Sequence, residues 1–224
     1  MRLNLLKKRN NTEKDILKRE VRKLEENVKK VAENLVTACK RAYTRGIQTG
    51  SGGNVSARIP GEEKMLVKAS GSSFADSTPE GFVITDFDGN LIEGESKPTR
   101  EALLHGLLYR ICPWANGIVH THSPYSIAWT TTGKALERIT WHAKLKICAD
   151  FPTLNVEAAM VRREDFPLVE KVYKEFPELP GFLLADHGIV AVGKDIIEAE
   201  HTAELIEETA QAAILKAAVS KLGL

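Results

Sequence analysis

The sequence predicts a single mixed α/β domain, in which helices cover both faces of a largely antiparallel central sheet. Hydrophobic residues make up 43% of the 224 residues, which is enough for a sizeable core. Short β-type runs alternate with helical patterns in the order helix, several strands, helix, strand, helix, hairpin, helix. An order of this kind suits helices that pack on a largely antiparallel sheet.

The N-terminal part is expected to be helical and basic. Residues 13–44 are expected to form one amphipathic helix or two in succession, because apolar residues recur at helical spacing, at Leu24, Val28, Val31, Leu35 and Ala38. Residues 1–30 hold eleven Lys and Arg against five Asp and Glu. We therefore divide the chain into a basic helical extension, 1–24, and a domain, 25–224. The basic residues are expected to form a solvated face, with an oligomer contact or an anion-attracting rim as alternatives.

The next part of the chain predicts strands and one hairpin. SGGNVSAR (51–58) is a Gly-rich turn that enters a short strand, and MLVKASG (65–71) is a strand that ends at Gly71. FVITDFDGNLIEG (82–94) is the clearest hairpin, because apolar residues flank Asp88-Gly89 and glycine accepts the positive φ of a tight turn.

The second half alternates helices with buried strands. Residues 100–111 are expected to form a helix with leucines on its buried side and Thr99 as its cap. GIVH (117–120) is a short buried strand that ends at His120, and residues 124–132 are expected to be helical. FLLADHGIVAVG (182–193) predicts strand, turn and strand, with His187 in the turn. Residues 195–219 form a long closing helix with a buried stripe.

Charge and cysteine content indicate a cytoplasmic protein. The formal net charge of +1 gives no indication of nucleic acid or a membrane surface as a partner. No apolar run approaches the ~20 residues of a spanning helix, and the basic start lacks the apolar stretch of a secretory signal. Cys39, Cys112 and Cys148 are far apart and form no CxxC, so we expect three small buried thiols in a reducing compartment.

Three of the six histidines are candidate metal ligands. In a strand, residues i and i+2 point to the same side, so His120-Thr-His122 aims two imidazoles one way. Such a pair alone is a modest signal, but this one follows a buried strand, and His187 lies between two other apolar strands. Three protein ligands with one open position is the arrangement of catalytic zinc. His105, His142 and His201 are weaker candidates for metal ligands. His105 and His201 lie on predicted helices and are expected to be ordinary packed or surface residues.

Five motifs carry a resemblance to a known family. SGGNVSAR, ASG, KPTREALLHGLLY, GIVHTHSPYSIAW and DHGIVAVG, in this order and spacing, resemble the class II aldolase/adducin family from about residue 25 to 215. The family includes L-fuculose-1-phosphate and rhamnulose-1-phosphate aldolases, L-ribulose-5-phosphate 4-epimerases, methylthioribulose-1-phosphate dehydratases and the non-enzymatic adducin heads. The resemblance implies Zn²⁺, or another divalent ion such as Mn²⁺ or Co²⁺, a phosphorylated sugar as substrate, and a homo-oligomer, typically a tetramer with active sites between subunits.

The resemblance also implies roles for individual residues. The family's metal histidines fall on His120, His122 and His187, and its catalytic acid, which is also beside the metal, falls on Glu101. Gly-rich turns and helix N-termini present backbone N–H groups to anions. The positions where the family binds substrate phosphate are Gly53, Asn54, Ser70, Gly71, Thr99 and Arg100. Without the family, SGGN and ASG would be interpreted as plain turns.

Several positions depart from the family's patterns. Arg100 stands where the aldolases usually have a small hydroxyl residue; it could pair with phosphate or carboxylate, or face solvent. Lys144 stands where the epimerases have an Asp, and the last tyrosine, Tyr173, is far from the C-terminal position that they use. The aldolases' tyrosines have no evident counterpart either, although Trp141 or His142 lies near one. The general acid that serves the aldehyde fragment is therefore unassigned.

The function expected from these residues is reversible cleavage of a phosphorylated ketose. The products would be dihydroxyacetone phosphate, or a related phosphorylated fragment, and an aldehyde, formed through a metal-stabilised enediolate. Glu101 would move the proton at the reacting carbon. The alternatives are an enzyme like the ribulose-phosphate epimerases or the methylthioribulose-phosphate dehydratases, and a binding module like the adducin head.

Overall fold

The computed structural model describes residues 25–223. The predicted basic extension, residues 1–24, lies outside the described residues. The first described element is a helix that runs from residue 25 to residue 44, in agreement with the predicted end near Gly46. Its apolar stripe is buried at Leu35 and Ala38, so this helix belongs to the core of the domain.

The centre of the domain is an eight-stranded sheet with the strand order β4-β3-β2-β1-β5-β8-β7-β6. Every neighbouring pair is antiparallel except β6 and β7, which run parallel. The prediction of a largely antiparallel sheet is confirmed. The strands are β1 (Asn54–Arg58), β2 (Lys64–Lys68), β3 (Phe82–Asp86), β4 (Leu91–Glu93), β5 (Gly117–Thr121), β6 (Thr153–Leu154), β7 (Gly181–Leu184) and β8 (Gly188–Gly193).

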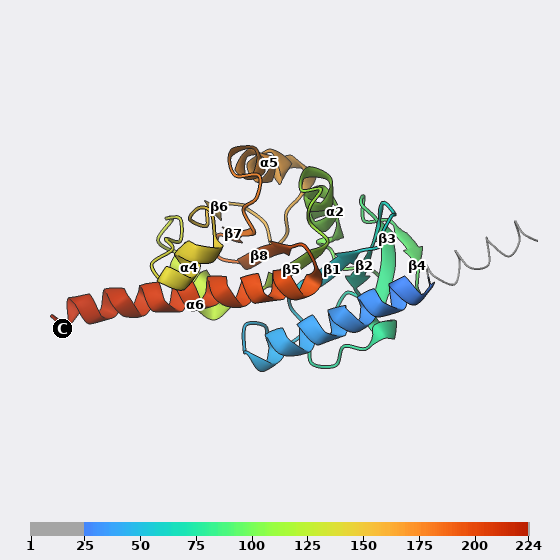
Figure 1. The fold of residues 1–224 in the computed structure, drawn as a ribbon, viewed down its shortest axis with the longest axis horizontal. Helices are drawn as coiled ribbons and strands as arrows, with labels where there is room; N and C mark the ends of the chain where they lie inside the picture. Colours follow the sequence, from blue (N-terminus) through green and yellow to red (C-terminus); the bar gives the residue numbers. More distant parts are fainter. Residues whose placement is uncertain (1–24, 224) are drawn as a thin grey trace, which may run out of the picture.

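Helices cover both faces of this sheet, as predicted (Figure 1). The long helix α6 (Ile196–Lys221) and the helix 25–44 lie on one side, and α2 (Ala102–Ile111) and α5 (Phe166–Glu175) lie on the other. The short helix α3 (Pro124–Thr130) packs against α6, β7 and β8. Gly117 and Gly193 let α6 approach β5 and β8 closely, because a Cβ at either position would collide with the backbone of α6.

The elements expected from the sequence are present with small shifts. The hairpin β3–β4 turns at Asp88-Gly89, where Gly89 has a φ of 80°. Helix α2 begins at Ala102 instead of residue 100, and no side chain caps it, so the prediction that Thr99 caps it is wrong. The Thr99 carbonyl accepts the Ala102 N–H at 3.2 Å, which turns the chain before the helix begins. Three further elements of the structure were not predicted from the sequence: α4 (Trp141–Lys146), α5 and β6.

The cysteines differ in part from the prediction. All three are free thiols, but Cys148 is exposed, whereas Cys39 and Cys112 are buried. Cys148 lies in the loop that follows α4, where the chain runs over the surface, so the expectation of three buried thiols is wrong at this position. Within residues 25–223, none of the helices has the length and the apolar content that crossing a bilayer requires.

Candidate active site

The strand β5 places His120 in the middle of the sheet. Its Cα is paired with Asn54 on β1 and with Val190 on β8, and the residue is 1% exposed. His120 Nδ1 lies 2.8 Å from the carbonyl oxygen of Ile189. A carbonyl can only accept, so Nδ1 carries the ring proton and the lone pair of Nε2 remains free. Nε2 is therefore the atom that this residue offers to a metal ion.

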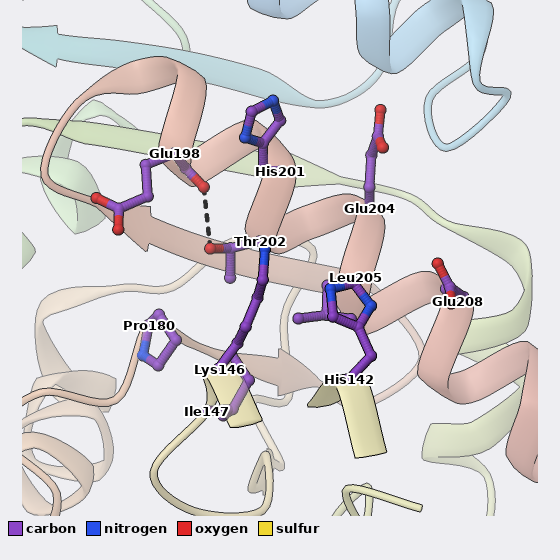
Figure 2. A pocket seen from close by; sticks show the side chains of 10 residues that line it. All are labelled: His142, Lys146, Ile147, Pro180, Glu198, His201, Thr202, Glu204, Leu205 and Glu208. Atoms are coloured by element: carbon purple, nitrogen blue, oxygen red, sulfur yellow. Dashed lines mark hydrogen bonds between the residues drawn. The ribbon is translucent and has the colours of Figure 1, made fainter. Parts of the chain in front are cut away.

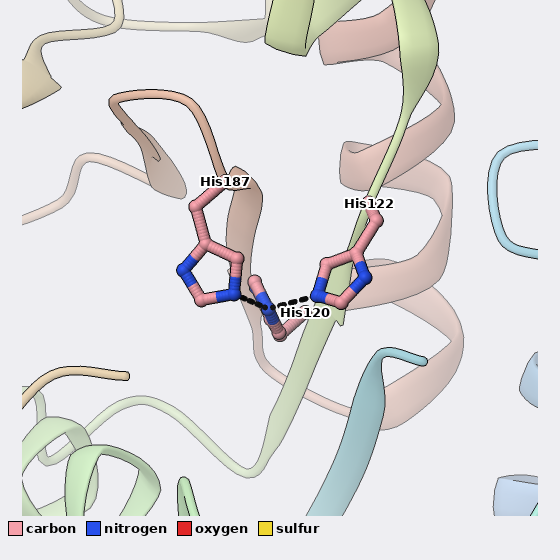
Figure 3. A group of neighbouring side chains, drawn as sticks. All are labelled: His120, His122 and His187. Atoms are coloured by element: carbon pink, nitrogen blue, oxygen red, sulfur yellow. Dashed lines mark hydrogen bonds between the residues drawn. The ribbon is translucent and has the colours of Figure 1, made fainter. Parts of the chain in front are cut away.

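The other two histidines bring the same atom to His120 (Figure 3). His122 follows β5, and His187 lies in the turn between β7 and β8. The Nε2 atoms of His122 and His187 each lie 3.2 Å from the Nε2 of His120, and one ligand atom from each of the three lies within 4.8 Å of the others. The predicted convergence of the three imidazoles is present, and the group has the composition of a divalent-metal site.

Burial keeps these imidazoles neutral. Desolvation lowers the pKa of His120 to about 3 and that of His187 to about 4, and it also lowers the pKa of His122. In the absence of a cation, the Nε2 atoms of His122 and His187 lie at hydrogen-bond distance from the Nε2 of His120, so each can donate a proton to it. Metal ions bind the deprotonated nitrogen, so a cation would replace these hydrogen bonds and take three nitrogen ligands.

Glu101 stands beside the three histidines at the start of α2. The residue is 4% exposed, its Oε2 lies 3.6 Å from His120 Nε2, and its Oε1 accepts the N–H of Val161 at 3.2 Å. Among residues 25–223, nothing forms a hydrogen bond with the buried Oε2. Burial raises the pKa of this carboxyl. A buried oxygen without a hydrogen-bond partner beside three imidazole nitrogens fits a bound divalent cation, which would satisfy all four side chains.

A cavity of about 300 Å³ opens in front of this group. The histidines and Glu101 line one part of it. An isolated antiparallel β-bridge between Ala69 and Pro98 brings the segment after β2 next to the segment before α2. Residues of both segments line the cavity. The same cavity is lined by every residue that the resemblance assigned to phosphate binding, namely Gly53, Asn54, Ser70, Gly71, Thr99 and Arg100. Arg100 is exposed and, within residues 25–223, takes part in no hydrogen bond or ion pair.

Lys68 also lines the cavity, although it was not among the site residues predicted from the sequence. This last residue of β2 is only 2% exposed, and its Nζ donates to the carbonyl oxygens of Ser72 at 2.6 Å and Ala69 at 3.3 Å. Burial lowers its pKa, and no carboxylate in the described part of the chain forms an ion pair with it. A buried cation without an acidic partner gives the cavity an affinity for anions. In the sequence, the feature that could have indicated a role for Lys68 in this site is its position directly before Ala69-Ser70-Gly71.

A second cavity, of about 480 Å³, lies between α4 and α6 (Figure 2). His142 and His201 line it together with acidic residues of α6, and both imidazoles are exposed. In Figure 2 their rings stand apart, and the hydrogen bond drawn there joins Thr202 to the Glu198 carbonyl within α6. Neither histidine belongs to a ligand cluster found among residues 25–223, in line with the weaker claims expected from the sequence.

Comparison with known proteins agrees with this geometry. Residues 33–214 match the family described as Class II Aldolase and Adducin N-terminal domain. The chain is 32% identical over 186 residues to an L-fuculose phosphate aldolase from Methanocaldococcus jannaschii, which covers 83% of this chain and 97% of that one. It is 32% identical over 183 residues to a 3-oxo-tetronate 4-phosphate decarboxylase from Haemophilus influenzae, with 80% and 84% covered.

A solved structure shows the same fold. The L-fuculose-1-phosphate aldolase from Thermus thermophilus superimposes with a TM-score of 0.74 at 23% identity, over 85% of this chain and 96% of that one. The resemblance seen in the five sequence motifs is thus confirmed over most of the domain. Given the family match over residues 33–214 and relatives that are 32% identical over four-fifths of its length, the chain belongs to the class II aldolase/adducin family.

Proposed function

We propose that this protein is a divalent-metal enzyme that reversibly cleaves a phosphorylated ketose into dihydroxyacetone phosphate, or a related phosphorylated fragment, and an aldehyde. The observation that carries the proposal is the buried, unpartnered Glu101 Oε2 beside three converging imidazole nitrogens, at one end of a cavity with cationic residues. The similarity to an L-fuculose phosphate aldolase over 97% of that relative's length supports this reaction class.

One part of the cavity would bind the phosphate group. Lys68 supplies a buried positive charge there, and Arg100 supplies a second one at the exposed rim. Backbone N–H groups of the glycine-containing turns at Gly53 and Gly71 complete a site for a dianion. These contacts would fix the position of the substrate's reacting carbons relative to Glu101, which is the orientation effect that makes an intramolecular proton transfer fast.

The other part would carry the chemistry. His120, His122 and His187 would hold Zn²⁺, Mn²⁺ or Co²⁺, and a bound divalent cation supplies a Lewis acid that stabilises negative charge on the substrate's oxygens. Glu101 would move the proton at the reacting carbon through Oε2. General acid–base catalysis of this type typically contributes about 10²–10⁴-fold.

Decarboxylation of a phosphorylated 3-oxo acid is the second candidate. The Haemophilus influenzae relative at 32% identity is a 3-oxo-tetronate 4-phosphate decarboxylase. Arg100 has no carboxylate partner in the described chain and lines the cavity, so it could bind a second acidic group. An epimerase remains a weaker alternative because Lys144 replaces an Asp, and retention of the three histidines and the acid argues against an adducin-like binding module.

A homo-oligomer, with a tetramer as the expected form, also belongs to the proposal. No tyrosine lines the cavity, so its described walls offer no such general acid for the aldehyde fragment. A neighbouring subunit would supply that group. Light scattering of the purified protein measures the assembly mass, and a monomer would contradict this expectation. The cytoplasmic location remains a prediction from the cysteine content.

Substitution of Glu101 tests the proposed reaction. We expect Glu101→Gln to retain stoichiometric metal and to lose activity by about 10²–10⁴-fold, since the amide cannot exchange the proton. The assay follows cleavage and CO₂ release over a panel of phosphorylated ketoses and 3-oxo acids, with Zn²⁺, Mn²⁺ and Co²⁺ in parallel. Glu95→Gln, an exposed acid before α2, is the control. Full activity of Glu101→Gln would discard the assignment, and wild-type protein without stoichiometric metal would favour the binding module.

A further inference from the structure

We propose that α3 positions two of the three metal-binding histidines, with Glu207 and Thr130 as the residues that fix its ends. This inference rests on the metal site proposed above. His122 precedes the first residue of α3 by two positions, and His187 lies in the turn that the end of α3 contacts. The helix therefore connects two ligands that are distant along the chain. Glu207 and Thr130 touch no ligand atom, so they act as positioning residues.

The first end of α3 is fixed by a carboxylate on α6. Glu207 is 7% exposed, and its Oε1 accepts the Tyr125 N–H at 2.9 Å. Its Oε2 accepts the Ser126 N–H at 2.8 Å and the Ser126 hydroxyl at 2.7 Å. Three donors on one buried carboxylate make a short, charge-assisted set of bonds, which holds the start of α3 against the rigid helix α6. The residue that precedes this anchored turn by only three positions is His122.

The backbone around His122 is fixed on its other side as well. The N–H of His122 donates to the side-chain oxygen of Gln48 at 2.8 Å. The hydroxyl of Ser123 donates to the Ile47 carbonyl at 2.8 Å. Gln48 is 1% exposed and Ser123 is fully buried, so solvent does not compete for these bonds. The main chain at His122 is thus held between the loop after the helix 25–44 and the start of α3.

Thr130, the last residue of α3, fixes the turn that carries His187. The Thr130 hydroxyl donates to the Ile127 carbonyl at 2.7 Å, so its lone pairs are free to accept the Asp186 N–H at 3.0 Å. Asp186 has a φ of 53°, and no other non-glycine residue in the described chain has a positive φ. Left-handed backbone is unfavourable for a residue with a Cβ and persists where its surroundings enforce it. The next residue is His187.

His122 and His187 depend on their backbone for position more than His120 does. His120 is buried within β5, and its Nδ1 is bonded to the Ile189 carbonyl. Within residues 25–223, Nδ1 of His122 and Nδ1 of His187 have no hydrogen-bond partner, and both residues lie outside the strands and are half-buried. Partners that orient a metal ligand are worth about 10–100-fold in metal affinity. For these two histidines, α3 provides that orientation through the main chain.

Metal affinity of Thr130 variants tests the inference. Thr130→Val keeps the shape of the side chain but leaves the Asp186 N–H without its acceptor. We expect Zn²⁺ to bind about 10–100-fold more weakly, measured by competition with a chromogenic chelator, and the Co²⁺ absorption spectrum to change. Thr130→Ser keeps the hydroxyl and should restore wild-type binding. Thr131→Val is the matched control, because the hydroxyl of this exposed neighbour donates to the Ala128 carbonyl of α3 and, within residues 25–223, to no residue outside that helix.

Variants of α6 test the other end independently. Glu207→Gln removes the charge that receives three donors, whereas Glu208→Gln changes an exposed acid one position away. We expect only Glu207→Gln to weaken metal binding, and this pair decides the question if Thr130→Val does not fold. The inference is overturned if the Thr130 and Glu207 variants lower only the melting temperature and bind Zn²⁺ as the wild type does. Wild-type protein that binds no Zn²⁺ would instead overturn the proposed function.

Discussion

Acid should destabilise the metal-free protein partly through His105, a residue of α2 that is 0% exposed. Its Nδ1 lies 2.7 Å from Ser56 Oγ, which lies 2.8 Å from the Tyr109 hydroxyl. Ser56 is the only described partner of that hydroxyl, so the three side chains form one buried hydrogen-bonded chain. The imidazole is neutral in the folded protein. Burial, followed by the neighbouring His120, lowers its pKa from 6.5 to about 3.

The sign of the effect follows from which state binds the proton first. The unfolded chain protonates this imidazole near pH 6.5, and the folded protein does so only near pH 3. The contribution of His105 to the free energy of unfolding is therefore complete above about pH 6.5 and is lost as the pH falls from there toward 3. The slope in this window approaches about 1.4 kcal/mol per pH unit. From pH 6 to pH 4, the loss amounts to about 2.5 kcal/mol.

Urea unfolding at pH 6, 5 and 4, in the presence of a chelator, measures this loss. His105→Asn keeps a hydrogen-bonding group near the Nδ1 position for Ser56 but does not titrate. Between pH 6 and pH 4, the free energy of unfolding should therefore fall by about 2.5 kcal/mol more in the wild type than in this variant. His201→Asn, which changes an exposed histidine of α6, should follow the wild type. Equal pH dependence of the wild type and His105→Asn would refute the reasoning.

Three other substitutions test single contacts. Gly188→Ala should lower stability by about 2 kcal/mol or more and weaken Zn²⁺ binding, measured by thermal melting and chelator competition, because φ is 149° and a Cβ would collide with the Thr121 carbonyl. Lys68→Met should raise KM for a phosphorylated substrate about tenfold or more, with unchanged metal content, since a charged hydrogen bond is worth about 1.5–3 kcal/mol. Arg41→Ala should lower the free energy of unfolding in urea by about 1 kcal/mol at pH 9, since solvent screens the 42% exposed Arg41 in its 3.0 Å pair with the buried Glu200. The loss should be smaller at pH 6, where Glu200, whose pKa is about 8, is protonated.

The parts of the fold that could be predicted are those with a strong local pattern. The hairpin at Asp88-Gly89 and the long helix α6 follow from periodicity and turn chemistry, which are properties of neighbouring residues. The helices α4 and α5 were missed. Helix α4 has only six residues, and it exposes Trp141 and Leu145, so it shows no apolar stripe that faces the core. The two-residue strand β6 is too short to show any period.

The site was predictable where strand ends determine it. His120 lies next to the last residue of the buried strand β5, His187 lies in the turn before β8, and the two strands are neighbours in the sheet, so the two imidazoles meet. Lys68 could not be recognised as buried, because a lysine at the end of KMLVK has the same local pattern as a solvent-exposed lysine at a strand end. Its burial arises from the chain at residues 69–72, whose carbonyl oxygens accept hydrogen bonds from its Nζ.

The same distinction separates the metal ligands from the residues that position them. A ligand must be a histidine or an acid, so residue type and spacing give it a signal in the sequence. Thr130 contributes only one lone pair to an N–H that lies 56 positions away, and any threonine at the end of a helix looks the same in the sequence. Its role exists only because β7, β8 and α6 bring Asp186 next to α3. Contacts of this kind follow from the tertiary structure, which is why substitutions with no effect on the ligand set are expected to change metal affinity.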